Sequence, residues 1–132
     1  MSDPLPALIR VLVVEDEFLI RLTLTEALRD EGFEVLEAET GDAALPMLAP
    51  GSGIQLLLTD IQLPGSLNGL ALVDQVRRDL PDLPVIYMTG RPDQNGSGAS
   101  SPLDVYVAKP YTLTDICNAV KRLTSARSTS GV

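Results

Sequence analysis

The sequence RVLVVED, from Arg10 to Asp16, decides the fold because it runs a buried strand directly into an acidic pair. Its first five residues are nearly all apolar and mostly β-branched, which is typical of a strand covered on both faces of a parallel sheet. Similar apolar runs recur at Phe33–Ala38, Ile54–Thr59, Pro84–Thr89 and Leu103–Ala108. We therefore expect a sheet of five parallel strands.

Segments with the apolar spacing of helices separate these strands. They span Glu17–Glu31, Thr40–Ala49, Leu70–Leu80 and Thr112–Thr124. In the first of them, Phe18 and Leu19 are expected on the buried face with Leu28. Pro46 predicts a kinked or truncated second helix, because proline removes a hydrogen bond and clashes with the preceding turn. Alternating strands and helices predict a doubly wound α/β sandwich with helices on both faces of the sheet.

The overall composition excludes several classes of protein. The chain has 132 residues, of which 45% are hydrophobic and 21% charged, as in ordinary globular domains. Ten basic against 18 acidic residues give a net charge of −8, which disfavours nucleic-acid binding. Without histidine, Ser-His-Asp catalysis and His-containing zinc sites are impossible. The lone cysteine, Cys117, cannot form an intrachain disulfide and is expected to be a small buried hydrophobe.

The sequence predicts a single domain between two short terminal segments. We expect a leader at residues 1–9, one domain at 10–124 and a polar tail at 125–132. Only eight residues follow Thr124, so an output domain is not expected. No segment has the pattern of a signal peptide or approaches 18 consecutive apolar residues, so we expect a cytoplasmic protein without membrane contact.

Polar residues follow four of the predicted strands. Glu15 and Asp16 follow the first strand, Asp60 the third, Thr89 ends the fourth and Lys109 follows the fifth. In doubly wound sheets the site lies at the carboxyl ends of the strands, so these side chains are expected to converge. Each alone would be read as a helix cap, a turn residue or a solvated side chain. Together, three carboxylates without histidine or cysteine predict a Mg²⁺ site.

These residues lie in motifs that resemble the receiver domain of bacterial two-component response regulators. The motifs are Val14-Glu15-Asp16-Glu17, Leu58-Thr59-Asp60-Ile61-Gln62-Leu63-Pro64, Asn68-Gly69, Met88-Thr89-Gly90 and Ala108-Lys109-Pro110-Tyr111. The resemblance covers about Arg10 to Leu123. It implies a five-stranded flavodoxin-like fold with strand order 2-1-3-4-5, as in the CheY-like members of the family.

The resemblance also implies a role for each acidic residue. Asp60 would be the phosphoacceptor, forming an aspartyl phosphate. Asp16 and Asp60 would ligate Mg²⁺, with Glu15 contributing directly or through water. The backbone carbonyl of Gln62 would complete the protein ligands. Glu15 replaces the aspartate that is commoner in the family.

The remaining site residues would bind the phosphoryl group and change conformation when it is present. Lys109 would pair with the phosphoryl oxygens, and the Thr89 hydroxyl would donate to one of them. The Lys109–Pro110 peptide bond is expected to be cis. Thr89 would move toward the phosphate, and Tyr106 would rotate inward behind it. Alternatively, Tyr106 is an ordinary aromatic residue of a strand.

The resemblance implies a signalling module that phosphorylates itself and slowly loses the phosphate, rather than an enzyme. Its partners would be a histidine kinase or phosphotransfer protein and a downstream protein target, with no nucleic acid or membrane. The protein would be a monomer, or a weak dimer through the face of the fourth helix, fifth strand and fifth helix.

Two segments depart from the family pattern. Gly65-Ser66-Leu67-Asn68 makes the loop after Asp60 one residue longer than usual. Arg91–Ser101 is polar and rich in glycine and serine, so the fourth helix is expected to be absent, short or mobile. This segment either orders on phosphorylation or is a surface loop without a role.

Two other functions stay open at this point. A receiver-like interaction module that is never phosphorylated is one alternative. A phosphohydrolase with Asp60 as nucleophile is the other. A haloacid-dehalogenase-type enzyme, however, needs a second acidic residue where Gln62 stands.

Overall fold

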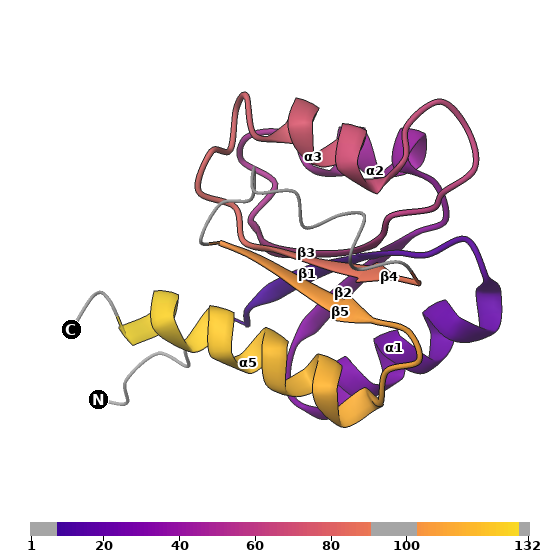
Figure 1. The fold of residues 1–132 in the computed structure, drawn as a ribbon. Coiled ribbons are helices and arrows are strands. Elements are labelled where there is room, and N and C mark those ends of the chain that lie inside the picture. Colours follow the sequence, from indigo (N-terminus) through magenta and orange to yellow (C-terminus); the bar gives the residue numbers. More distant parts are fainter. Residues whose placement is uncertain (1–7, 91–102, 130–132) are drawn as a thin grey trace.

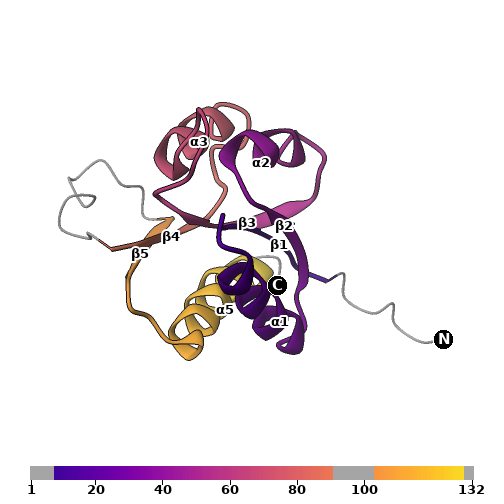
Figure 2. The same ribbon diagram turned by 90° about the vertical axis from the view of Figure 1, so that its right-hand side faces the viewer.

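The computed structural model describes residues 8–90 and 103–129, which form a five-stranded parallel sheet in the order β2-β1-β3-β4-β5. The strands are β1 (Arg10–Val14), β2 (Glu34–Ala38), β3 (Ile54–Asp60), β4 (Val85–Thr89) and β5 (Asp104–Ala108). The helices are α1 (Phe18–Asp30), α2 (Gly41–Met47), α3 (Gly69–Val76) and α5 (Leu113–Thr129). Helices α2 and α3 cover one face of the sheet, and α1 and α5 cover the other (Figures 1 and 2). The predicted fold class and strand order are therefore confirmed.

The sheet separates two apolar cores, because successive side chains of a strand point to opposite faces. Leu12 and Val14 of β1 belong to the core beneath α2 and α3. Val11 and Val13 belong to the core that α1 and α5 cover. Cys117 lies in this second core and is buried, as predicted. Strands buried on both faces explain why their sequences read as continuous apolar runs.

The first helix differs from its prediction at its start. Phe18 is 60% exposed and Leu19 is 69% exposed, although both were expected on the buried face. Helix α1 begins beyond the carboxyl edge of the sheet (Figure 1), so no strand lies beneath its first turn. Leu24 and Leu28, farther along, are buried.

Helix α3 ends at Val76 instead of Leu80. The chain tightens there into turns, with Arg78 N donating to the Gln75 oxygen and Asp79 N donating to the Val76 oxygen. The Arg77 guanidinium donates to the Leu83 carbonyl at 2.8 Å and pairs with Asp104 at the start of β5. These contacts fix the turn that leads into β4.

The other helices show how local residues set helix length. Helix α2 is short, with Pro46 inside it, and ends at Met47, as the proline predicts. Helix α5 continues to Thr129, beyond the predicted end at Thr124 and into the expected tail. No glycine or proline interrupts that stretch.

Arg91–Ser101, where the fourth helix was expected to be absent, short or mobile, lies outside the described residues. Within residues 8–90 and 103–129, no helix combines the length and apolar character needed to cross a membrane.

Gly69 should be intolerant of any side chain, because it begins α3 against the backbone of Asp60. A Cβ there would overlap the Asp60 backbone oxygen and lie 3.0 Å from the Ile61 Cα. Gly69→Ala is therefore expected to lower the free energy of unfolding by about 1–3 kcal/mol, measured by urea denaturation. Gly90→Ala is the control: among the described residues, a Cβ at Gly90 would meet nothing within 4 Å, so the change should stay within about 0.5 kcal/mol. Equal stability of the two variants would contradict this account.

Candidate functional site

The register of two central strands brings the predicted acidic residues together. Val14 of β1 pairs with Thr59 of β3, so Glu15 and Asp60 follow on adjacent strands at the same edge. One carboxylate oxygen from each of Glu15, Asp16 and Asp60 lies within 4.8 Å of the others. Figure 2 looks onto this carboxyl edge of the sheet. The structure thus forms the predicted cluster.

The three carboxylates differ in burial. Glu15 is 1% exposed and Asp60 is 4% exposed, whereas Asp16 is exposed. Glu15 Oε2 accepts a hydrogen bond from the Glu17 amide at 3.0 Å. Its Oε1 is buried and has no hydrogen-bond partner among the described residues. A buried oxygen in that condition is costly unless another group, such as a cation, satisfies it.

The position of Glu15 raises its pKa from the ordinary 4.5 to about 7. Burial is the largest cause, and the negative charge of Asp60 adds to it, while the hydrogen bond from the Glu17 amide opposes the shift. Near neutral pH, Glu15 therefore exchanges its proton readily. A cation bound at the cluster would favour the ionised form.

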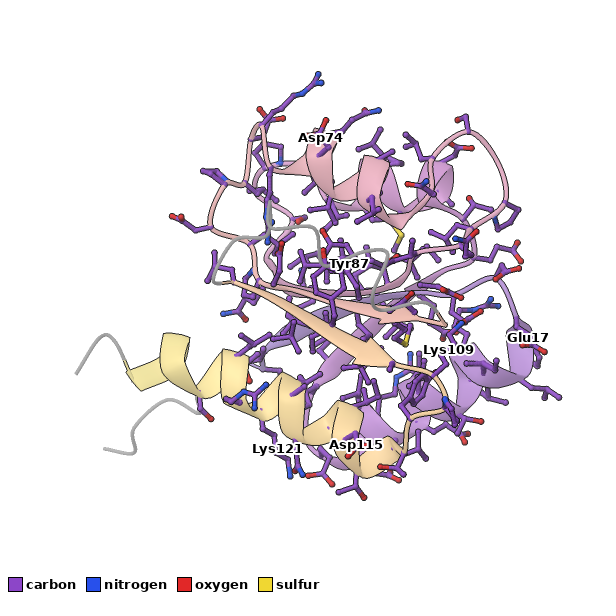
Figure 3. The ribbon with its side chains drawn as sticks, viewed as in Figure 1. Glu17, Asp74, Tyr87, Lys109, Asp115 and Lys121 are labelled. Atoms are coloured by element: carbon purple, nitrogen blue, oxygen red, sulfur yellow. The ribbon has the colours of Figure 1, made fainter. Side chains whose placement is uncertain are left out.

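Lys109 brings the positive charge to the cluster. Its Nζ lies 2.9 Å from Asp60 Oδ2, and its amide donates to the Thr89 carbonyl at 2.7 Å. The Lys109–Pro110 peptide bond is cis, the conformation expected for it. Figure 3 shows Lys109 at the same end of the sheet as Glu17, which follows the acidic pair.

Thr89 and Tyr106 lie on the α2 and α3 side of the sheet. Thr89 is buried at the end of β4, one residue beyond Met88, which is the register partner of Asp60. Tyr106 of β5 pairs with Tyr87 of β4, and their rings stack with centroids 4.7 Å apart. Tyr106 is only partly buried. The predicted switch residues are thus on one face, with Tyr87 as a contact that the sequence did not indicate.

Two further residues at this edge were not predicted as part of the site. The Arg21 guanidinium of α1 donates to the Glu15 carbonyl at 2.8 Å and to Glu37 at 3.2 Å, so it fixes the turn that carries the acidic pair. Tyr111 has its pKa raised to about 12, first by burial and then by the charges of Glu15 and Asp60. The position of Arg21 in the predicted first helix could have indicated its role. For Tyr111, the indication was its place in the motif that follows Lys109.

The residues present fit a hard divalent cation. All three side chains offer carboxylate oxygen, and Mg²⁺ is usually bound by one or two carboxylates together with water and phosphate oxygens. The buried Glu15 Oε1 supplies an acceptor that still lacks a partner among the described residues. The backbone N–H of Gln62 donates to Asp60 Oδ1 at 3.3 Å, and the Gln62 side chain is exposed. Its carbonyl as a metal ligand stays a prediction.

Comparison with known proteins gives one family. The model of the response regulator receiver domain matches residues 11–121. The chain is 38% identical over 108 residues to the chemotaxis protein CheY of Pseudomonas aeruginosa, covering 78% of this chain and 86% of that protein. It is 33% identical to a probable transcriptional regulatory protein of Picosynechococcus, covering 86% of this chain but 49% of the relative. The chain thus spans about half the length of some curated relatives.

Solved structures give the same result. A response regulator receiver protein from Sinorhizobium medicae superposes with a TM-score of 0.83 at 28% identity, covering 91% of this chain and 97% of that one. The response regulator TrrA from Thermotoga maritima, solved in complex with Mg²⁺ and BeF, superposes with a TM-score of 0.76 at 34% identity. That comparison covers 88% of this chain and 99% of TrrA.

The raised pKa of Glu15 predicts a pH-dependent stability of the metal-free protein. Because the folded protein binds this proton more tightly than the unfolded chain, the stabilisation is complete below pH 4.5 and is lost as the pH rises through about 7. Glutamine does not ionise, so the Glu15→Gln variant should not lose stability in this way. The free energy of unfolding of the variant, minus that of wild type, should therefore increase from pH 5 to pH 8. Thermal denaturation in EDTA measures the difference.

A matched control is Glu39→Gln, which neutralises an exposed carboxylate. Its stability relative to wild type should not change over the same pH range. A Glu15→Gln profile parallel to that of wild type would show that Glu15 does not hold the proton.

Proposed function

The chain belongs to the response regulator receiver domain family, and from that premise we propose that it accepts a phosphoryl group on Asp60. Receiver domains are signalling modules whose partners include histidine kinases and downstream targets, and phosphorylation-dependent signalling is general in the family. The donor would be a histidine kinase or a phosphotransfer protein. One observation supports the proposal most: the buried Asp60 contacts Lys109 Nζ at 2.9 Å and has a carboxylate oxygen within 4.8 Å of those of Glu15 and Asp16.

In the proposed reaction, an Asp60 carboxylate oxygen is the nucleophile. It forms a bond to the phosphorus of a phosphohistidine while the bond from phosphorus to the imidazole nitrogen breaks. The imidazole keeps that electron pair, and the product is an aspartyl phosphate. The chain has no histidine of its own, so it acts as the acceptor in this exchange.

Lys109 and Thr89 would stabilise the transferred group. The ammonium of Lys109 already contacts Asp60 Oδ2, so a short movement would let it pair with a phosphoryl oxygen. Thr89 would donate its hydroxyl to another oxygen from the end of the neighbouring strand. Fixed donors aimed at the developing charge are the main contribution of a protein to phosphoryl transfer.

Glu15, Asp16, Asp60 and the backbone carbonyl of Gln62 would hold a Mg²⁺ ion. When bound, the ion would offset the negative charge of the carboxylates and of the incoming phosphoryl group. The unsatisfied Glu15 Oε1 and the all-oxygen donor set support this assignment.

The output would be a change in the surface around β4 and β5. Movement of Thr89 toward the phosphate would open space on the face where Tyr106 stacks on Tyr87. Tyr106 could then turn further inward, changing the surface that a protein target contacts. Passing the phosphoryl group to another protein is the other outcome open to an aspartyl phosphate.

The donor protein would dock on an apolar hollow beside Lys109. This hollow, about 460 Å³, lies between the first half of α1 and the turn from β5 to α5. It is lined by Leu19, Ile20, Thr23, Leu24, Lys109, Pro110, Tyr111 and Leu113. Lys109 lines the hollow and also contacts Asp60, so a protein seated there would reach the phosphoacceptor. The exposure of Leu19 agrees with such a contact.

The two alternative functions have less support. A module that is never phosphorylated has no use for a buried carboxylate cluster paired with lysine, which is costly to assemble without a ligand. A phosphohydrolase of the haloacid-dehalogenase type would need an acidic side chain at Gln62. The response of wild type and Asp60→Asn to a phosphoryl donor distinguishes all three functions.

Asp60→Asn should abolish phosphorylation, because the amide cannot act as the nucleophile. We expect Mg²⁺ and beryllofluoride, or acetyl phosphate, to shift the amide spectra of wild type around Thr89 and Tyr106, and the variant to show no such shift. Mass spectrometry should find one added phosphoryl group in wild type only. A wild type that does not respond would support the inert module, and rapid turnover of a small phosphate ester would support a hydrolase.

Leu19→Glu should separate docking from chemistry. Placing a charge in the hollow should slow transfer from a protein donor by about tenfold or more. The rate with acetyl phosphate should stay within about twofold of wild type, because the small donor needs no docking surface. Leu70→Glu, on α3 and 38% exposed, is the matched control and should affect neither rate. An equal loss with both donors would place Leu19 outside the docking surface.

A further inference from the structure

The loop between Asp60 and α3 is tied to α2 by a pair of hydrogen bonds. Asp42, in the first turn of α2, accepts from the Ser66 hydroxyl with Oδ1 at 2.6 Å and from the Ser66 amide with Oδ2 at 3.1 Å. The two bonds lower the pKa of Asp42 below its ordinary value. They join segments 24 residues apart in the chain. We call this pair the Asp42–Ser66 clamp.

The backbone around the clamp is shaped to fit it. Gly65 has a φ of +90°, and a Cβ there would lie 2.7 Å from Asp42 Oδ2. Glycine adopts this φ without strain, and its missing Cβ leaves the carboxylate in place, whereas a larger residue would strain the backbone and displace the carboxylate. On the other side, a Cβ on Gly41 would lie 2.5 Å from the Leu67 carbonyl oxygen. Two glycines thus let the loop and the start of α2 meet at close range.

Both ends of this loop contact the backbone or side chain of Asp60. At its start, the Gln62 amide donates to Asp60 Oδ1 at 3.3 Å. At its end, the Gly69 amide donates to the Ile61 carbonyl at 2.9 Å, and Gly69 packs on the Asp60 backbone. The loop is therefore closed at its base on the proposed phosphoacceptor, and Asp42 holds it at Ser66.

From these contacts we propose that Asp42, acting through Ser66, is a positioning residue for the phosphorylation site. The clamp fixes the backbone of residues 62–68, and with it the orientation of the Gln62 peptide toward Asp60 and toward a cation that would bind there. A site held in advance loses less conformational entropy when its ligand binds. The inference rests on the proposed function.

The first test is a Mg²⁺ titration followed by the amide shifts of residues near Asp60. Asp42→Ala removes both hydrogen bonds and should weaken Mg²⁺ binding by about three- to tenfold, and slow phosphorylation by acetyl phosphate in the same direction. Ser66→Ala removes one bond and no charge, and should have a smaller effect of the same sign. The Gln62 amide signal should broaden or shift in both variants, with little change in melting temperature.

Asp74→Ala controls for the lost charge. Asp74 lies on the outer side of α3 (Figure 3), and its side chain is 81% exposed. This variant should bind Mg²⁺ as wild type does. If Asp42→Ala and Asp74→Ala weaken binding equally while Ser66→Ala has no effect, the loss is due to charge and the clamp is refuted.

Gly65→Ala tests the clamp without changing either partner. Its Cβ would push against Asp42, so it should weaken Mg²⁺ binding in the wild-type background. In the Asp42→Ala background the same substitution should cost less, because the two changes disturb one contact. Full additivity, or wild-type affinity for Gly65→Ala, would overturn the proposal. Because Mg²⁺ titration requires no phosphorylation, these results are independent of whether Asp60 accepts a phosphoryl group.

Discussion

The pairing of β1 with β3 is the constraint on which the site depends. In a parallel ladder both strands end at the same edge, and the match of Val14 with Thr59 places the next residue of each strand side by side. A slip of one residue would turn one strand's side chains to the opposite face. Leu57 and Leu58 lie in the two opposite cores, so that slip would exchange their surroundings and disrupt the packing on both faces of the sheet. Hydrophobic packing therefore holds Glu15 against Asp60 in spite of their like charges.

The electrostatics of the edge follow from this enforced proximity. Carboxylates placed so close and so deep raise the free energy of the ionised state, which is why Glu15 holds its proton to about pH 7. The ammonium of Lys109 relieves the repulsion on one side only. The remaining negative potential would favour the divalent cation proposed above. Burial of Glu15 beside Asp60 thus raises the pKa of Glu15, and a cation held there, as proposed above, would displace that proton.

The sequence predicts the strands and the acidic cluster well, because both depend on local patterns. Apolar runs mark buried strands, and residues that follow parallel strands must share an edge. Contacts between distant segments carry no such pattern. The early end of α3 depends on Arg77 reaching Leu83 and Asp104, and the Asp42–Ser66 clamp depends on where α2 begins. The exposure of Phe18 was mispredicted because helical spacing does not show where the sheet beneath a helix ends.

The stacking of Tyr87 and Tyr106 gives the protein an optical property. The chain has no tryptophan and three tyrosines, so its near-ultraviolet absorption comes almost entirely from tyrosine. Two rings with centroids 4.7 Å apart and an interplanar angle of 19° couple their electronic transitions. Near-ultraviolet circular dichroism should therefore respond to the geometry of this pair, with Tyr111 as the other tyrosine that contributes. A movement of Tyr106 could be followed in real time, without a label and without an introduced fluorophore.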